Sequence, residues 1–116
     1  MNDSLQDLAR ELDRFARDRD WKQFHSPKNL ASALIVEAGE LLEHFQWMSE
    51  AQSRELAPEQ LETVGAEIAD VLLYLIQLAD ALGIDPVVAA RAKLQVNELK
   101  YPVDSARGSS KKYDKL

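Results

Sequence analysis

Apolar residues recur at helical spacing along almost the whole chain, and this period constrains the fold more than any other feature. The first such segment has four apolar residues separated by three or four positions: Leu5, Leu8, Leu12 and Phe15. This spacing is typical of one face of an amphipathic helix. No segment stands out with the alternation of apolar and polar residues that predicts a strand. The sequence therefore predicts an all-α fold.

Prolines, glycine and capping residues divide this period into four helices. Ser26-Pro27 and Asp85-Pro86 each place a capping residue before a proline, which is typical of a helix start. Gly83 follows the third apolar stripe, where a helix commonly ends. We expect helices over about residues 5–17, 28–49, 58–82 and 86–100, joined by connections that include 19–26 and 49–59. The expected architecture is a four-helix bundle.

The second and third expected helices carry apolar stripes that are wide for a lone bundle of 116 residues. An apolar stripe is stable in water only when another surface covers it. We therefore expect copies of the chain to associate, as a homodimer or as a homotetramer built from two dimers. We expect one domain over residues 1–103 and a polar basic tail over 104–116, which either closes over a bound ligand or merely aids solubility.

Composition excludes several classes of function. With a net charge of −6, the chain lacks the basic surface expected of a protein that binds nucleic acid or an anionic membrane. The absence of cysteine excludes a disulfide framework and a thiolate metal site. No stretch approaches the ~18 apolar residues of a membrane span. The polar residues 1–4 are unlike a signal peptide, so a cytoplasmic location is the default expectation.

Two pairs of acidic residues interrupt the apolar helices. Glu37 and Glu40 lie on the second expected helix, and the third carries Glu67 and Asp70. A spacing of three puts both members of a pair on one side of the helix, bordering the apolar stripe. Neighbouring helices would bring the four carboxylates together, although two such charges ~4 Å apart repel by about 1 kcal/mol even in water. Oxygen ligands without cysteine favour a hard divalent cation, Mg²⁺.

Aromatic residues near these acids point to a nucleotide. Trp47 follows Glu40 by seven residues, about 10 Å along a helix axis, which matches the reach from a phosphate to a base. Trp21, in the loop before the second helix, and Tyr74, on the third helix, offer further ring faces for stacking. Taken alone, Trp47 and Tyr74 are more often residues of an interface or of the edge of the core, and Trp21 with Phe24 is more often a hydrophobic anchor of a loop.

Other chemistries fit the sequence less well. Di-iron bundles use Glu-x-x-His pairs, whereas both pairs here are acidic and His44 follows Glu40 by four residues. His25 and His44 lack ligand spacing to another histidine, and we interpret them as hydrogen-bonding residues. The chain has no Gly-x-x-x-x-Gly-Lys phosphate loop. A non-enzymatic helical interaction domain is the main alternative, but it does not explain acids that border both apolar stripes.

The order of these residues resembles that of the MazG-like all-α nucleoside triphosphate pyrophosphohydrolases, and within them the dCTP pyrophosphatase family. The resemblance spans most of the chain through Arg19-Asp20-Trp21, Gln23-Phe24-His25, Glu37, Gly39-Glu40-Leu41, Phe45-Gln46-Trp47, Glu67, Asp70-Val71-Leu72, Tyr74-Leu75, Lys93, Asn97, Tyr101-Pro102 and residues 109–113. It implies a Mg²⁺-dependent hydrolase that releases a nucleoside monophosphate and pyrophosphate. It also implies a dimer or tetramer with sites near the subunit interfaces.

The resemblance assigns roles to particular residues. It implies that the metal-binding and catalytic residues are Glu37, Glu40, Glu67 and Asp70. It implies that the nucleotide-binding residues are Trp21, Lys22, Gln23, Phe24, His25, Trp47 and Tyr74. Lys93 and Asn97, four apart on the fourth helix, are predicted to hold phosphate. Leu12 stands where animal members that prefer dCTP have a histidine that contacts the substrate, so dUTP or a damaged nucleotide is an alternative substrate.

Overall fold

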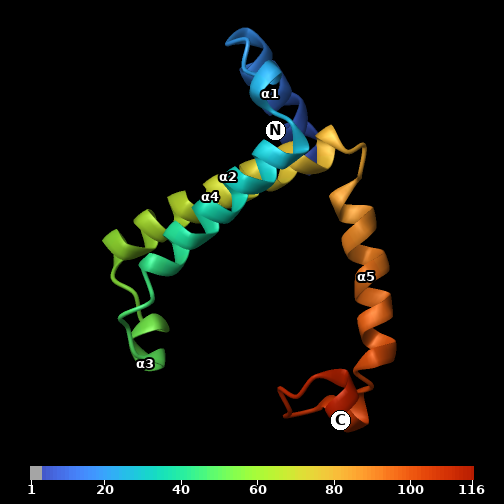
Figure 1. Ribbon diagram of the computed structural model, residues 1–116. Coiled ribbons are helices and arrows are strands. Elements are labelled where there is room, and N and C mark those ends of the chain that lie inside the picture. Colours follow the sequence, from blue (N-terminus) through green and yellow to red (C-terminus); the bar gives the residue numbers. More distant parts are fainter. Residues whose placement is uncertain (1–3) are drawn as a thin grey trace. The chain divides into compact units, whose positions relative to one another are not determined.

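The computed structural model describes residues 4–116, and this part of the chain is all-α, as predicted, without a strand. The long helices are α1 (Leu5–Asp18), α2 (Pro27–Glu43), α4 (Pro58–Ala81) and α5 (Pro86–Lys100) (Figure 1). The short ones are η1 (Lys22–Phe24), α3 (Glu50–Ser53), α6 (Val103–Ala106) and η2 (Tyr113–Lys115). No single helix among these residues is both long and apolar enough to cross a membrane; only α4 and α5 counted together reach the required length and hydropathy. Of residues 1–4, which are unlike a signal peptide by sequence, residues 1–3 lie outside the described residues.

The helix boundaries follow the capping residues that the sequence predicted. Ser26 Oγ accepts a hydrogen bond from the backbone N–H of Asn29 at 3.2 Å, and Asp85 Oδ1 accepts one from that of Val87 at 2.9 Å. A proline follows each cap in the first turn of its helix, where a missing N–H costs nothing. Gly83 follows α4 with a φ of +68°, a conformation that glycine adopts at least cost.

α2 ends at Glu43 rather than near Ser49, so its predicted length is wrong. Turns occupy the residues that follow, and Ser49 then caps α3 through a capping box with Gln52. Ser49 must have an extended backbone to act as a cap, which prevents α2 from continuing through it. Trp47 therefore does not lie on a helix, contrary to the prediction, and its spacing from Glu40 cannot be derived from the helix rise.

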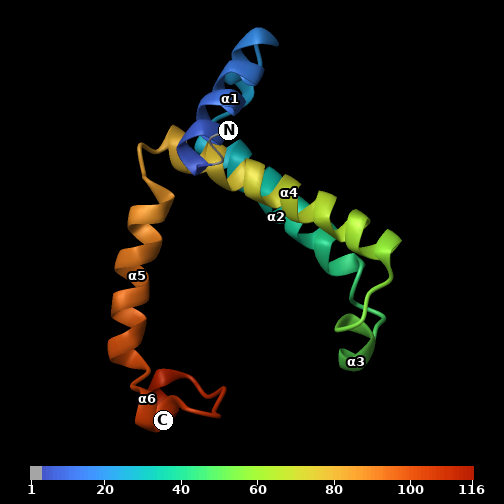
Figure 2. The same ribbon diagram turned by 180° about the vertical axis from the view of Figure 1, so that it is seen from behind.

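The chain divides into two units, residues 1–83 and 84–116. In the first, α2 and α4 lie side by side and α1 packs against α4 (Figures 1 and 2). Three of the four long helices thus share one unit, and α5 begins the other. The buried apolar residues among those described are few: Ala16, Leu30, Val64, Ile76 and Ala79. The side-by-side pairing of α2 and α4 is what positions the acidic residues.

The tail that follows α5 has structure of its own. The ring of Tyr113 meets that of Tyr101 edge to face, with centroids 6.3 Å apart. Lys100 Nζ lies 4.7 Å from the centroid of the Tyr113 ring, within the range of a cation–π contact. These contacts bring the last residues of the chain back to the end of α5. The division into a domain over residues 1–103 and a tail stays a prediction.

Candidate functional site

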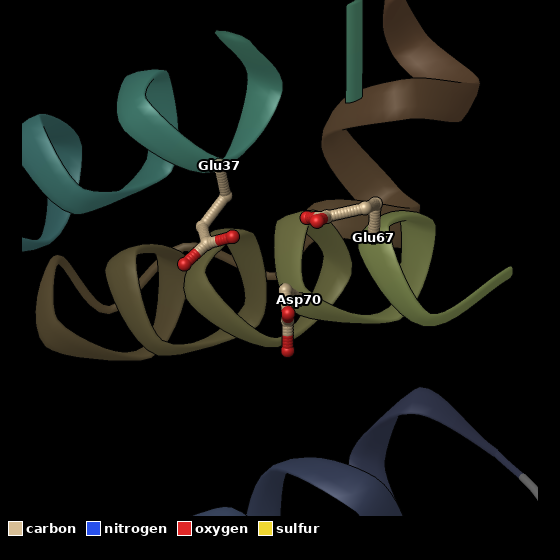
Figure 3. Close-up of side chains that lie close together, drawn as sticks. All are labelled: Glu37, Glu67 and Asp70. Carbon is tan, nitrogen blue, oxygen red and sulfur yellow. The ribbon is translucent and has the colours of Figure 1, made fainter. Parts of the chain in front are cut away.

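Three of the four predicted carboxylates meet between α2 and α4. Glu37 comes from α2, Glu67 and Asp70 come from α4, and each offers an oxygen within 4.8 Å of the others. Figure 3 shows Glu37 reaching from its helix toward α4 and Glu67 extended toward Glu37. The spacing of three between Glu67 and Asp70 places both on the side of α4 that borders α2. We call Glu37, Glu67 and Asp70 the carboxylate group.

The carboxylate group is partly withdrawn from solvent, and two of its oxygens have no hydrogen-bond partner. Oε2 of Glu37 and Oε2 of Glu67 are both buried without a partner. Buried polar atoms in proteins are almost always hydrogen-bonded, and an anionic oxygen costs the most when it is left alone. A cation bound between α2 and α4 would satisfy both atoms. The residues present therefore fit a hard divalent cation, which prefers oxygen ligands.

Glu40 is the predicted ligand that the structure leaves outside the carboxylate group. It nevertheless lies beside Glu37, because a hydrogen bond between the two carboxyls is the main cause that raises the pKa of Glu37 to about 7. Burial and the negative charges of the neighbouring acids raise this pKa further. A carboxyl that keeps its proton near neutral pH is expected where several acids meet without a cation. The metal-binding roles of all four acids stay predictions.

The raised pKa of Glu37 predicts that stability depends on pH in metal-free buffer. The folded chain binds this proton more tightly than the unfolded chain, in which the pKa is near 4.5. Between about pH 4.5 and pH 7 the folded state holds more protons, so the contribution of Glu37 to the free energy of unfolding falls as pH rises. Urea unfolding with EDTA should show this decrease, and Glu37→Gln should lack it.

Saturating Mg²⁺ provides the control for this pH dependence. The cation binds the ionised carboxylate of the folded chain, so it should offset the loss of stability at the upper end of the range. The difference between wild type and Glu37→Gln isolates this carboxyl from the other acids that titrate over the same range. If both proteins lose stability in parallel from about pH 4.5 to pH 7, the raised pKa assigned to Glu37 in the folded chain is wrong.

The aromatic residues predicted to bind the nucleotide keep much of their surface exposed. The Trp21 ring packs edge-on against Phe15, with centroids 5.6 Å apart, and the residue remains 45% exposed. Trp47, in the turn that follows α2, is 88% exposed. Phe24 is exposed and Tyr74, on α4, is half-buried. Exposed aromatic residues of this size are suited to contact with a ligand or another chain.

Lys22 and His25 line a small cavity between α1, η1 and α4. The cavity has a volume of about 30 Å³, and Leu12 and Gln77 also line it. It has room for about one water molecule and is too small for a base. Lys22 Nζ lies 2.6 Å from Asp13 Oδ1, so the ammonium group predicted to contact the nucleotide is paired with a carboxylate. No sequence motif had marked Asp13 or Gln77 as part of this surface.

The remaining predicted residues lie on η1 and α5. The side-chain amide of Gln23 donates a hydrogen bond to the backbone carbonyl of Asp20 at 2.9 Å. Lys93 is exposed and Asn97 is half-buried, one turn apart on α5. Both belong to the second unit, so their approach to the carboxylate group stays a prediction.

His44 is a neighbour of the carboxylate group that the sequence interpretation did not include in the site. It follows the last residue of α2, and its Nε2 lies 3.7 Å from Oε1 of Glu67. The available signal was its position seven residues after Glu37, which is about two helical turns and therefore the same side of the helix. The site residues on α2 and α4 were chosen by the spacing of acids, and this criterion does not select His44.

Comparisons with known proteins agree with the family resemblance that the sequence indicated. Residues 33–116 match the MazG-like family. Human dCTP pyrophosphatase 1 is 40% identical over 115 residues, which cover 97% of this chain and 68% of the human protein. The rat protein of the same name is 43% identical over the same shares. The crystal structure of a pyrophosphatase from Archaeoglobus fulgidus has a TM-score of 0.75 and 40% identity, with 88% of this chain and 95% of that one covered.

The paired helices with their carboxylate group, together with the match over residues 33–116, define the class: the chain belongs to the MazG-like family. The predicted MazG-like fold and the predicted similarity to dCTP pyrophosphatases are confirmed. The prediction of an enzyme is confirmed too, because the similarity to pyrophosphatases extends over nearly the whole chain. The alternative of a non-enzymatic interaction domain is set aside.

Proposed function

We propose that this pyrophosphohydrolase converts dCTP, or a modified dCTP, to the monophosphate and pyrophosphate with Mg²⁺ as its cofactor. The observation that carries the proposal is the carboxylate group, in which each residue offers one oxygen within 4.8 Å of the others and two oxygens are buried without a partner. The identity of 40% and 43% to human and rat dCTP pyrophosphatase 1 supports the choice of nucleotide. House-cleaning of the nucleotide pool in the cytoplasm belongs to the same proposal.

The four acids are proposed to have two different roles. Glu37, Glu67 and Asp70 would hold the cation, which would offset negative charge on the triphosphate oxygens. Glu40 lies beside the carboxylate group but outside it, which leaves its carboxylate to orient the attacking water and accept its proton. The water oxygen bonds to a phosphorus of the anhydride between the first and second phosphates as the bridging P–O bond breaks, and pyrophosphate and the monophosphate are the products.

The nucleotide is proposed to bind through the residues named from the sequence. The exposed rings of Trp21, Phe24 and Trp47, with Tyr74, offer stacking surfaces for the base. Polar groups on η1 and beside it are also proposed to contact the substrate: Lys22, Gln23 and His25. Lys22 would do so once its ion pair with Asp13 opens. Lys93 and Asn97 are proposed to hold phosphate. Residues 84–116, which include both, carry more basic than acidic side chains, although the whole chain has a net charge of −6.

Trp47→Ala tests the stacking role. Loss of a base–aromatic contact costs about 1–3 kcal/mol, which corresponds to a KM for dCTP raised by roughly 5-fold to 150-fold. Because Trp47 is 88% exposed, the free energy of unfolding should hardly change. Steady-state kinetics and urea unfolding give the two values. Trp47→Phe keeps an aromatic ring and should stay close to wild type, whereas a KM unaltered in Trp47→Ala would remove Trp47 from the site.

Copies of the chain are proposed to associate through apolar residues that α4 and α2 leave exposed. We call four residues at seven-residue spacing the α4 stripe: Leu61, Ile68 and Leu75 on α4, and Leu82 directly after its last residue. They are between 43% and 58% exposed. Ile35 and Leu42 on α2 repeat the same spacing and are 69% and 61% exposed. Seven-residue spacing keeps apolar side chains on one helix face, the arrangement through which helices of two copies pack. A homodimer, or a tetramer of two dimers, would cover these residues.

A nucleotide panel tests the proposed reaction. The full chain is incubated with dCTP, 5-methyl-dCTP, dUTP and dTTP, with Mg²⁺ or with EDTA, and pyrophosphate and monophosphate are measured. We expect dCMP and pyrophosphate in equal amounts from dCTP, and only with Mg²⁺. Preference for dUTP would keep the chemistry but reject dCTP as the substrate. The panel includes dUTP because Leu12 stands where animal members that prefer dCTP have a histidine that contacts the substrate. No turnover of any nucleotide would reject the function.

A further inference from the structure

His44 contacts the carboxylate group but has no role in the reaction proposed above. Its Nε2 lies 3.7 Å from Oε1 of Glu67, and the two side chains are only 31% and 20% exposed. The other oxygen of Glu67, Oε2, is buried without a hydrogen-bond partner. The two oxygens of one carboxylate thus have different surroundings, with a potential donor on one side and none on the other.

We propose that His44 is a positioning residue that holds Oε1 of Glu67 and leaves Oε2 for the divalent cation. The inference rests on the proposed metal function of the carboxylate group. A metal-binding carboxylate is commonly fixed by a hydrogen bond to a second residue, and loss of such a partner typically weakens metal binding by about 10-fold to 100-fold. Glu67 would then bind through one oxygen in a fixed direction.

The surroundings of His44 allow the small movement that this role requires. The pair at 3.7 Å must shorten by about half an ångström to reach hydrogen-bond distance. The imidazole borders a hollow of about 210 Å³, lined also by Met48, Thr63 and Val64, so a small rotation displaces few atoms. Glu59 lines the same hollow, but the carboxylate that lies 3.7 Å from Nε2 of His44 is that of Glu67.

Calorimetric titration of the full chain with Mg²⁺, without nucleotide, tests the proposal. His44→Leu removes the donor at similar size, His44→Gln keeps an N–H donor, and Met48→Leu changes the same hollow without a polar group. We expect the Kd for Mg²⁺ to rise by about 10-fold to 100-fold in His44→Leu, by much less in His44→Gln and not at all in Met48→Leu. The Mg²⁺ concentration for half-maximal activity should shift in the same order, while kcat at saturating Mg²⁺ recovers.

The outcomes separate this inference from the proposed function. Wild-type affinity in His44→Leu, or equal weakening in His44→Gln and His44→Leu, overturns the positioning role and leaves the metal centre in place. Wild-type protein that binds no Mg²⁺ overturns both. Urea unfolding in EDTA should be nearly the same for wild type and His44→Leu, because the contact of 3.7 Å is longer than a hydrogen bond in the metal-free chain. Should His44→Leu fail to fold, His44→Ala takes its place in the comparison.

Discussion

Glu37→Gln is expected to lose about 100-fold to 1000-fold in kcat for Mg²⁺-dependent release of pyrophosphate from dCTP. Glutamine has the shape of glutamate but no charge, so the substitution removes one anionic oxygen from the three that lie within 4.8 Å. A preorganised group that stabilises developing charge typically contributes this much to kcat. Steady-state kinetics at saturating Mg²⁺ and dCTP measures the loss.

Glu43→Gln is the matched control for this substitution. Glu43 is the last residue of α2 and is exposed, and the exchange is chemically the same. It should leave kcat near the wild-type value. In metal-free buffer Glu37→Gln should be at least as stable as wild type, because it removes repulsion among the acids. Equal kcat in Glu37→Gln and wild type would reject Glu37 as a metal ligand.

Leu75→Glu is expected to raise the dissociation constant of the oligomer by at least about 100-fold. Leu75 lies in the middle of the α4 stripe and is 43% exposed in the single chain. A charge placed there would be buried without a partner in the interface, and a twofold axis repeats it in the second copy. Light scattering coupled to size-exclusion chromatography should therefore give the mass of one chain for the variant and a multiple of it for wild type.

Ala69→Glu is the control for Leu75→Glu. It adds the same charge to α4 at an exposed position, about 120° around the helix from Leu75. This variant should keep the wild-type mass, because its side chain lies away from the α4 stripe. Leu75→Glu with the mass of the wild-type oligomer would show that another surface joins the copies.

The helices and their starts could be predicted because local chemistry determines them. Ser26 and Asp85 act as caps through hydrogen bonds within three residues, so the sequence contains the whole interaction. The end of α2 could not be predicted from its apolar period, which continues past Glu43. The capping box between Ser49 and Gln52 competes with that period and determines the boundary.

The meeting of Glu37, Glu67 and Asp70 was predictable because both acid pairs border stripes that must face one another. Helical position does not, however, fix the side-chain rotamer, and Glu40 pairs with Glu37 instead of joining the carboxylate group. The ion pair between Lys22 and Asp13 joins residues nine apart in sequence across a turn. No local rule encodes such a tertiary contact.

Anomalous diffraction from crystals of the full chain grown with Mn²⁺, a stand-in for Mg²⁺, tests the central claim most directly. The claim is that α2 and α4 bring oxygens of Glu37, Glu67 and Asp70 together around a divalent cation. The account predicts an anomalous peak about 2.1 Å from oxygens of all three residues. Crystals that bind Mn²⁺ elsewhere, or show these oxygens apart and surrounded by water, would contradict it.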